Sequence, residues 1–125
     1  MVIGIGIDLF DVARMERELR EQGAEFRDSL FSAGEVEYCE GKRHPAQHYA
    51  ARFAAKEAVI KALAADGRAG SFWRDVEIRN EPSGRPVVVL SGRLREAADG
   101  LGARAVHVTL SHSQELALAA AIVEG

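Results

Sequence analysis

The chain has 125 residues, of which 47% are hydrophobic and 28% charged, and its formal net charge is −3. This length fits one ordinary domain with its own core, and the composition excludes a disordered or fibrous chain. The charge gives no overall attraction to nucleic acid or to an anionic membrane, and no stretch reaches the roughly 20 apolar residues of a membrane span. We therefore expect neither as a partner.

Two features concern the cellular compartment. The single cysteine, Cys39, cannot form an internal disulfide, which favours a reducing environment. Residues 2–10 are apolar, but they lack the basic start of a secretory leader and contain Asp8. We therefore expect a cytoplasmic protein.

The first stretch, residues 2–10 (VIGIGIDLF), alternates strictly, as a strand with two different faces does. The isoleucines share one face, and Gly4, Gly6 and Asp8 share the other. Glycine inside a strand marks a close approach, so we expect a helix packed on that face or a ligand reached by Asp8. For Asp8 alone, a polar strand end that caps a helix is an equally good interpretation.

A first helix is expected over residues 12–22, with Asp11 as its cap and Gly23 as its stop. Its outward face carries charges of both signs. The basic residues on that face are Arg14, Arg17 and Arg20. A solvated mixed-charge helix and a docking surface for an acidic partner both fit this pattern, and the residues alone do not favour docking.

A capping box from Ser32 to Glu35 predicts a second, short helix that runs to about residue 40. The next loop, residues 41–45 (GKRHP), places Arg43 and His44 directly before another helix. A basic loop ahead of a helix N-terminus can hold a phosphate group, although a soluble turn has the same composition.

The central helix is expected over residues 49–65, around the sequence RFAAKEAVIKAL. One side of it is entirely alanine, which lets another backbone approach closely. The bulky side also carries Lys56 and Glu57, whose burial without partners would cost several kcal/mol. An ion pair of Glu57 with Lys61 would be purely structural and would leave Lys56 on the apolar arc. We therefore favour a functional site on this helix.

The second half of the chain reads as a glycine-rich loop, strands and one helix. The loop is residues 66–71, the strands are residues 75–79, 86–90, 105–112 and 115–123, and the helix starts at Ser91 or Gly92 and runs to residue 100. The last strand is almost wholly apolar, so we expect both of its faces to be buried. The elements predict one α+β domain over residues 1–125, with a mainly antiparallel sheet packed on the long central helix.

The residues allow only some kinds of chemistry. No nucleophile motif and no zinc spacing are present, and Cys39 has no adjacent base. Asp8 and Glu57 are paired carboxylates on elements expected to pack together, and Mg²⁺ prefers one or two carboxylates with phosphate oxygens and waters. Basic residues that could offset phosphate charge are Arg52, Lys56, Lys61 and the loop at 41–45. This predicts a Mg²⁺-dependent enzyme acting on a phosphorylated substrate.

Four motifs resemble one known family in order and spacing. They are GIGIDLFDVARME at 4–16, RFAAKEAVIKAL at 52–63, EIRNEPSGRPVV with its Gly-x-Pro at 77–88, and HVTLSHSQELALAAAIVE at 107–124. Together they cover nearly the whole chain and look like holo-acyl-carrier-protein synthase, of the phosphopantetheinyl transferase superfamily. The resemblance implies transfer of the phosphopantetheine arm of coenzyme A to a serine of an acidic apo acyl carrier protein, in support of fatty acid biosynthesis. Adenosine 3′,5′-bisphosphate would be the by-product.

The resemblance also implies roles for individual residues. Asp8 and Glu57 match the carboxylates that hold Mg²⁺ with the pyrophosphate, Lys61 matches the lysine near the reacting phosphate, and Arg14 matches a residue that meets the carrier. Arg17 and Arg20 extend that docking face. The positions expected at the coenzyme A site are Arg43, His44, Arg52, Lys56, Gly84, Pro86 and His112. For His112, a hydrogen-bonded histidine at a strand end is the alternative.

The resemblance implies a homotrimer with each site at a subunit boundary, and the chain's shortage of solvated faces points to neighbouring subunits as well. After Leu63 the sequence departs from the family, since Ala64-Ala65-Asp66-Gly67-Arg68 replaces a common Gly-x-Gly run. Two other classes of function remain open. One is a Mg²⁺-dependent nucleotide hydrolase, and the other is a non-catalytic module that binds coenzyme A or a carrier.

Overall fold

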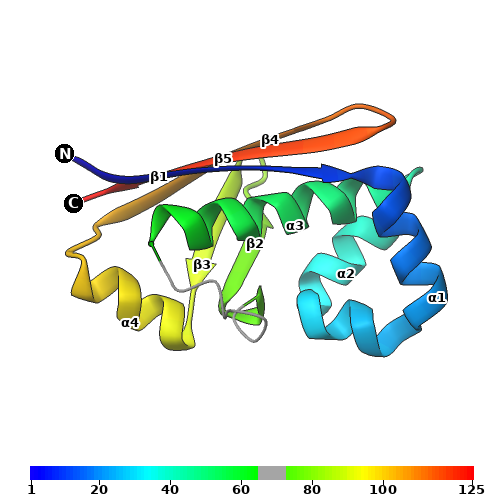
Figure 1. Cartoon of the computed structure of the whole chain (residues 1–125), viewed down its shortest axis with the longest axis horizontal. Helices are drawn as coiled ribbons and strands as arrows, with labels where there is room; N and C mark the ends of the chain where they lie inside the picture. Colours follow the sequence, from blue (N-terminus) through cyan, green and yellow to red (C-terminus); the bar gives the residue numbers. More distant parts are fainter. Residues whose placement is uncertain (65–72) are drawn as a thin grey trace.

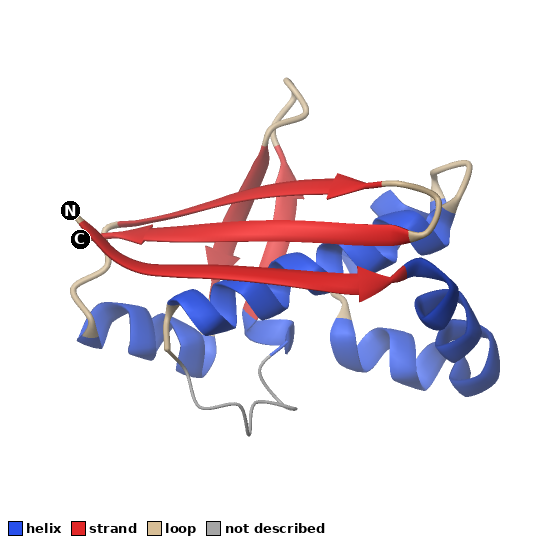
Figure 2. Cartoon of the chain, turned by 45° about the horizontal axis from the view of Figure 1, so that its top comes forward, coloured by secondary structure: helices blue, strands red, loops and turns tan. Residues whose placement is uncertain are grey.

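Three long strands form an antiparallel sheet above a helix in the computed structural model, which describes residues 1–64 and 73–125. The strand order is β1 (Val2–Asp11), β5 (Leu116–Glu124), β4 (Ala105–His112). The helix α3 (Pro45–Ala62) runs beneath the three strands, and α1 and α2 gather at one end of it (Figure 1). A hairpin of β2 (Val76–Asn80) and β3 (Pro86–Leu90) crosses the opposite side of α3 (Figure 2).

The contact between β1 and α3 is a backbone-to-backbone contact. A Cβ atom on Gly4 would lie 1.9 Å from the carbonyl oxygen of Ala62, and one on Gly6 would lie 2.0 Å from that of Ala58. No side chain fits there, so both positions require glycine. The predicted close approach of a backbone to the alanine side of the helix is confirmed, and it sets where Asp8 meets α3.

The helix α1 (Val12–Leu30) is longer than expected. The side chain of Asp11 caps it, accepting a hydrogen bond from the Arg14 amide at 3.0 Å. Gly23 departs from helical geometry with φ 71° and ψ −157°, but helical residues resume after it and continue to Leu30. Two helical segments therefore meet at Gly23: the predicted end of the first segment at residue 23 is confirmed, and the second segment, which continues to Leu30, was not predicted.

The other three helices of the described residues begin in different ways. The capping box of Ser32 and Glu35 is present at α2 (Ala33–Glu40), as predicted. α4 (Gly92–Gly100) has the expected range, but Ser91 makes no side-chain cap bond. Instead Asp75 in the short 3-10 turn η1 (Trp73–Asp75) accepts a hydrogen bond from the Arg93 amide at 3.0 Å. α3 starts at Pro45, which suits the first helical position because it needs no amide hydrogen.

The prediction that β5 is buried on both faces is wrong for the single chain. Ala117, Ala119, Ala121 and Val123 are buried against α3, whereas alternate residues face outward. The exposed apolar residues of β1 and β5 lie in register, since Ile5 pairs with Ile122 and Leu9 with Leu118. We call this surface the outer sheet face; its residues are Ile3, Ile5, Ile7, Leu9, Leu116, Leu118 and Ile122.

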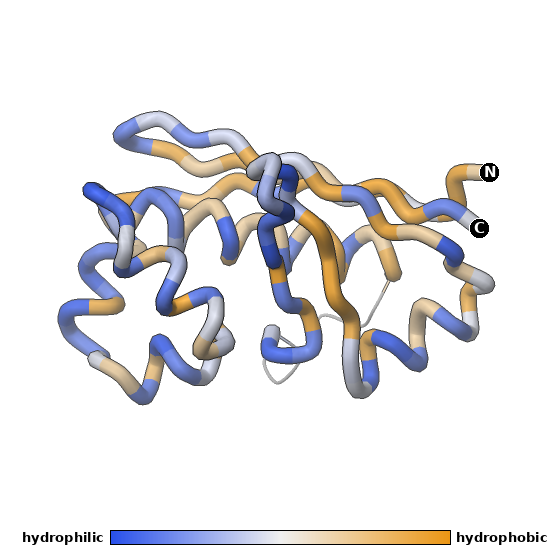
Figure 3. Tube along the Cα trace, turned by 180° about the vertical axis from the view of Figure 1, so that it is seen from behind, coloured by the Kyte–Doolittle hydropathy of each residue, from blue (hydrophilic) through white to orange (hydrophobic). Residues whose placement is uncertain are grey.

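The hydropathy of the chain differs between the strands and the first helix. Hydrophobic segments follow the strands, while α1 is mostly hydrophilic (Figure 3). None of the helices in the described part of the chain has the length and apolar character that a membrane crossing requires. The glycine-rich loop predicted at 66–71, and most of the departure from the family after Leu63, lie outside the described residues.

Candidate active site

Asp8 and Lys61 meet where β1 crosses α3. Gly6 lies against Ala58 of α3. The step from Gly6 to Asp8 covers about 6.6 Å along the strand, and one turn of four residues covers about 6 Å along the helix. Asp8 therefore lies beside the preceding turn of α3, which carries Glu57. The Nζ atom of Lys61 lies 2.9 Å from Asp8 Oδ1 and 3.0 Å from the carbonyl oxygen of Ile7. The Lys61 side chain is 54% exposed and that of Asp8 is 17% exposed. This ion pair therefore remains open to an entering ligand.

Glu57 has a different partner from the intrahelical pair considered above. Its Oε1 atom accepts a hydrogen bond from the indole Nε1 of Trp73 at 2.6 Å. Glu57 is half-buried, and Trp73 lies in η1 directly before β2. No local sequence pattern predicts this contact, because Trp73 lies 16 residues further along the chain.

Lys56 is fully buried, and its three N–H groups are used inside the protein. Nζ lies 2.8 Å from Glu35 Oε1 and 3.0 Å from the carbonyl oxygen of Trp73, and it also donates to the carbonyl oxygen of Val76. Burial lowers the pKa of Lys56, and the Glu35 carboxylate opposes that shift. No donor of Lys56 is left for coenzyme A, so the predicted ligand contact is wrong and the residue has a structural role.

The donor set at this site suits a hard divalent cation. Asp8 and Glu57 offer carboxylate oxygens, and each keeps one oxygen outside the hydrogen bonds just described. Within residues 1–64 and 73–125 no cluster of three or more His, Cys, Asp or Glu side chains could hold a metal alone. A metal bound here would complete its coordination with ligand phosphate and water, which is how Mg²⁺ is commonly held.

A pocket of about 220 Å³ lies on the other side of α3 and brings together four of the seven residues expected at the coenzyme A site. These four are Arg52, Gly84, Pro86 and His112. Arg52 comes from α3, Gly84 and Pro86 come from the β2–β3 turn, and His112 ends β4. Three separate parts of the chain thus converge on one opening.

Arg52 is the charged group best placed to hold an anion in this pocket. It is only 4% exposed, its Nη2 donates to Asn80 Oδ1 at 2.5 Å, and its guanidinium carbon lies 3.9 Å from the centre of the Tyr38 ring. Among the described residues, none accepts a hydrogen bond from its buried Nε. A buried N–H without an acceptor is costly, and the guanidinium charge of Arg52 at the pocket wall would attract an anion.

Sequence reasoning missed His48, which also lines this pocket. Its ring centre is 4.9 Å from that of His112. Burial lowers the pKa of His48, and the neighbouring His112, Lys42, Arg52 and His44 lower it further. His48 lies one helical turn before Arg52, so the i, i+4 spacing on the central helix could have revealed it.

The remaining expected site residues lie elsewhere. Arg43 and His44 line a separate pocket of about 430 Å³ with Glu16, at the junction of α1 and α3. Arg14, Arg17 and Arg20 are exposed on α1, as predicted, and Arg14 pairs with Glu18 at 3.2 Å. Burial raises the pKa of Cys39 to about 12, which agrees with the absence of a thiol nucleophile.

Comparisons with known proteins show which family this chain resembles over nearly its whole length. Residues 4–121 match the family model described as the 4′-phosphopantetheinyl transferase superfamily. The holo-[acyl-carrier-protein] synthase of Syntrophus aciditrophicus is 46% identical over 125 residues, which cover 100% of this chain and 98% of that protein.

Solved structures of the same kind share the fold. The holo-[acyl-carrier-protein] synthase of Neisseria meningitidis superposes with a TM-score of 0.88 at 28% identity, covering 100% of both chains. That of Helicobacter pylori, in complex with coenzyme A, gives 0.82 at 30% identity and covers 96% of this chain and 99% of that one. The family match and the full-length likeness lead to one conclusion: this chain belongs to the 4′-phosphopantetheinyl transferase superfamily.

Proposed function

We infer that this protein transfers the 4′-phosphopantetheine arm of coenzyme A to a serine of an apo acyl carrier protein. The products are holo acyl carrier protein and adenosine 3′,5′-bisphosphate, and the reaction supports fatty acid biosynthesis. The relative with 46% identity is a holo-[acyl-carrier-protein] synthase, and the Helicobacter pylori protein with this fold was solved with coenzyme A. The lone thiol, Cys39, is consistent with the cytoplasm as the place of action.

One observation carries this inference: an anion pocket and a carboxylate–lysine site both lie along α3. The pocket is lined by the positively charged Arg52, which suits the phosphates at the nucleotide end of coenzyme A. We assign the pyrophosphate to a second site that would combine Glu57 with Asp8 and its ion-pair partner Lys61. A substrate with phosphates at two places fits this pair of sites.

We propose that the reaction depends on Mg²⁺ held by Asp8 and Glu57. The ion would supply positive charge at the pyrophosphate, whose P–O–P bond between the two phosphates breaks while the pantetheine arm keeps its own phosphate. Lys61 would bring a further positive charge to the reacting phosphate, since its ammonium group is half-exposed beside Asp8. The serine hydroxyl of the carrier then attacks that phosphorus, and adenosine 3′,5′-bisphosphate leaves.

Nucleotide analysis separates this function from the two alternatives. Coenzyme A, Mg²⁺ and the protein are incubated with and without apo carrier, and adenosine 3′,5′-bisphosphate is measured by chromatography. We expect release only when the carrier is present, in equal amount to holo carrier formed. Release without a carrier would indicate a hydrolase, and no release in either mixture would indicate a binding module.

We further propose that three copies of the chain assemble through their outer sheet faces. The most exposed residue of the outer sheet face is Ile5, which is 73% accessible in the single chain. Ile122, which pairs with Ile5 across the strands, is apolar too. A continuous apolar stripe on two paired strands exceeds what scattered surface residues explain and indicates an interface. The number three comes from the family resemblance, and it would place each site at a boundary between subunits.

The carrier is expected to dock on α1. Arg14→Glu should lower affinity for an acidic carrier about tenfold and flatten the salt dependence of binding, since it reverses a charge that steers association. Affinity for coenzyme A should change little. Steady-state kinetics at several salt concentrations, varying each substrate in turn, measure both effects.

A matched control for this variant is Arg104→Glu, an exposed arginine outside α1. It should leave carrier use unchanged. Equal losses of affinity for carrier and coenzyme A in Arg14→Glu would show that the helix is structural or lies inside the site.

His48 predicts a pH dependence of coenzyme A binding. Its lowered pKa keeps it neutral near pH 7, and a bound phosphate would raise that pKa again. Binding should therefore take up a proton, and affinity should increase as pH falls from 8 towards about 6. The stability of the ligand-free protein should change with pH in the opposite direction. Because the pKa of His48 is lowered by folding, the free energy of unfolding should decrease as pH falls below the ordinary histidine value of 6.5.

Calorimetric titrations with adenosine 3′,5′-bisphosphate at several pH values measure this dependence. His48→Gln keeps the size and polarity of the side chain, and it should flatten the pH profile. A profile unchanged by the substitution would assign the proton to another group, such as His112.

A further inference from the structure

Trp73 is the only tryptophan of the chain and lies against a proposed metal-binding carboxylate. Its indole Nε1 donates to Glu57 Oε1 across 2.6 Å, a short hydrogen bond to a carboxylate. An indole N–H can only donate, so it cannot bind a cation and cannot exchange roles with the carboxylate. The contact therefore occupies one of the two carboxylate oxygens of Glu57.

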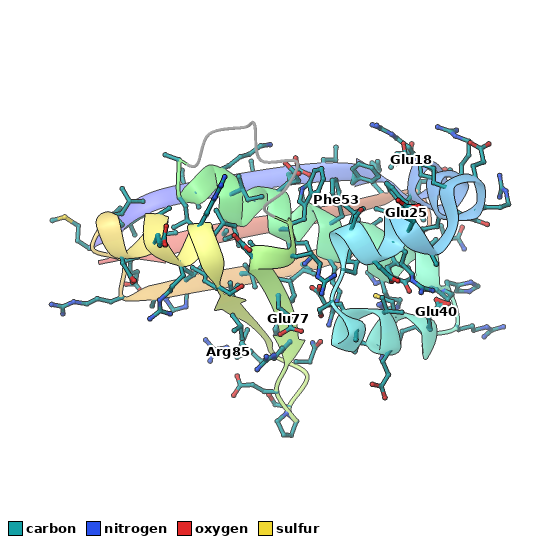
Figure 4. The ribbon with its side chains drawn as sticks, turned by 90° about the horizontal axis from the view of Figure 1, so that it is seen from below. Glu18, Glu25, Glu40, Phe53, Glu77 and Arg85 are labelled. Atoms are coloured by element: carbon teal, nitrogen blue, oxygen red, sulfur yellow. The ribbon has the colours of Figure 1, made fainter. Side chains whose placement is uncertain are left out.

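The position of Trp73 is fixed from two directions. First, the buried Nζ of Lys56 donates to the carbonyl oxygen of Trp73, the first residue of η1, and to that of Val76, the first residue of β2. Second, the ring of Phe53 lies 5.7 Å from the indole, tilted by 47°. Phe53 projects from α3 towards the side of the molecule viewed in Figure 4.

Lys56 and Glu57 are adjacent in the chain and act on the same short turn. Lys56 holds the backbone of η1 while Glu57 meets the indole that this backbone presents. Lys56 is itself held by Glu35, whose other oxygen accepts from the Ile78 amide at 3.0 Å. The buried ion pair thus connects α2, α3 and β2, and it places the Trp73 side chain at Glu57.

We propose that Trp73 is a positioning residue for Glu57. It holds Oε1, fixes the rotation of the carboxylate and leaves Oε2 directed to the metal. Groups that orient a metal ligand typically change metal affinity about 10- to 100-fold when removed. This inference rests on the proposed function in one respect, namely that Glu57 binds the metal.

Trp73→Phe tests it, because phenylalanine keeps an aromatic ring on Phe53 and removes only the N–H donor. Mn²⁺ binding is measured by calorimetry in the presence of coenzyme A, and activity is measured against Mg²⁺ concentration. We expect Mn²⁺ affinity to fall about 10- to 100-fold, with a matching increase in the Mg²⁺ concentration for half-maximal rate. The rate at saturating Mg²⁺ should fall much less, whereas a variant that is merely less stable would bind the metal normally.

Tyr49→Phe is the matched control, because it also removes one side-chain donor to a carboxylate, here from Glu40 Oε2 at 3.1 Å. Glu40 lies at the end of α2 (Figure 4), and this variant should bind Mn²⁺ like the wild type. Unchanged Mn²⁺ affinity in Trp73→Phe, with affinity lost in Glu57→Gln, would overturn the role of Trp73 and leave the metal site intact. Unchanged affinity in Glu57→Gln would overturn the metal site itself.

If Trp73→Phe does not fold, the wild-type protein decides the question. Mn²⁺ is paramagnetic and quenches a nearby indole, and the fluorescence of this chain comes from a single tryptophan. With coenzyme A present, we expect saturable quenching by Mn²⁺ in the wild type and none in Glu57→Gln. Absence of quenching in the wild type would contradict the proposal, because the metal would then lie away from Trp73.

Discussion

Asp8→Asn and Glu57→Gln should each lower turnover by about 10²–10³-fold, a loss typical of removing one electrostatic contact to the reacting group. Each substitution keeps the shape of the side chain and removes the negative charge that the metal requires. The measurement is the initial rate as a function of Mg²⁺ concentration. Asp99→Asn serves as the matched control, since Asp99 is an exposed carboxylate on α4 and should have no effect.

Loss of activity in these variants should not reflect unfolding. The ion pair of Asp8 with Lys61 is partly exposed, so its removal should cost about 1 kcal/mol or less. Urea unfolding of both variants checks this. Near-normal activity of either variant at limiting Mg²⁺ would contradict the assignment of the metal ligands.

Ile5→Glu should convert the assembly to monomers. The side chain is 73% exposed in the single chain, so the substitution leaves the folded monomer intact. In an assembly through the outer sheet face the new carboxylate would be buried without a partner, which costs about 3–5 kcal/mol. The association constant should therefore fall by at least about 100-fold.

Light scattering at several protein concentrations measures this change, alongside activity. Leu101→Glu is the control, because Leu101 is also an exposed apolar residue, at 45%, but lies outside the three-stranded sheet. If each site draws residues from two copies, the Ile5→Glu monomer should lose most of its activity. A fully active wild-type monomer would refute the assembly.

Complementation extends the same test to the site. Glu57→Gln and Arg14→Glu have defects on different elements, and Arg14 is expected to serve the site of a neighbouring subunit. Co-expressed or refolded together, the two variants should regain part of the activity, because some boundaries would carry both wild-type residues. Mixtures no more active than the separate variants would show that both residues act within one chain.

The sequence was sufficient to predict contacts that depend on pattern alone. The glycines of β1 and the alanines of α3 share one requirement, an approach too close for a Cβ, so each pattern predicted its half of the contact. The capping box of α2 is equally local. Seven residues were expected at the coenzyme A site from the family resemblance, and four of those seven line the pocket that contains Arg52.

Long-range pairing could not be predicted from the sequence. The sequence indicates that Lys56 needs a partner. That this partner is Glu35, 21 residues earlier, follows from how α2 packs on α3. The hydrogen bond of Trp73 to Glu57 depends in turn on η1, which Lys56 holds. The two faces of β5 were misjudged because an apolar strand has the same sequence pattern whether its second face is buried or exposed in the single chain.

The most direct test of the proposed function is the mass of the carrier protein. Apo acyl carrier protein is incubated with coenzyme A, Mg²⁺ and either the wild type or Glu57→Gln, and the intact carrier is weighed by mass spectrometry. We predict that the wild type adds the mass of one phosphopantetheine group to a single serine, and that Glu57→Gln leaves nearly all of the carrier unchanged in the same time. A carrier of unaltered mass after prolonged incubation with the wild type would contradict the proposed transfer.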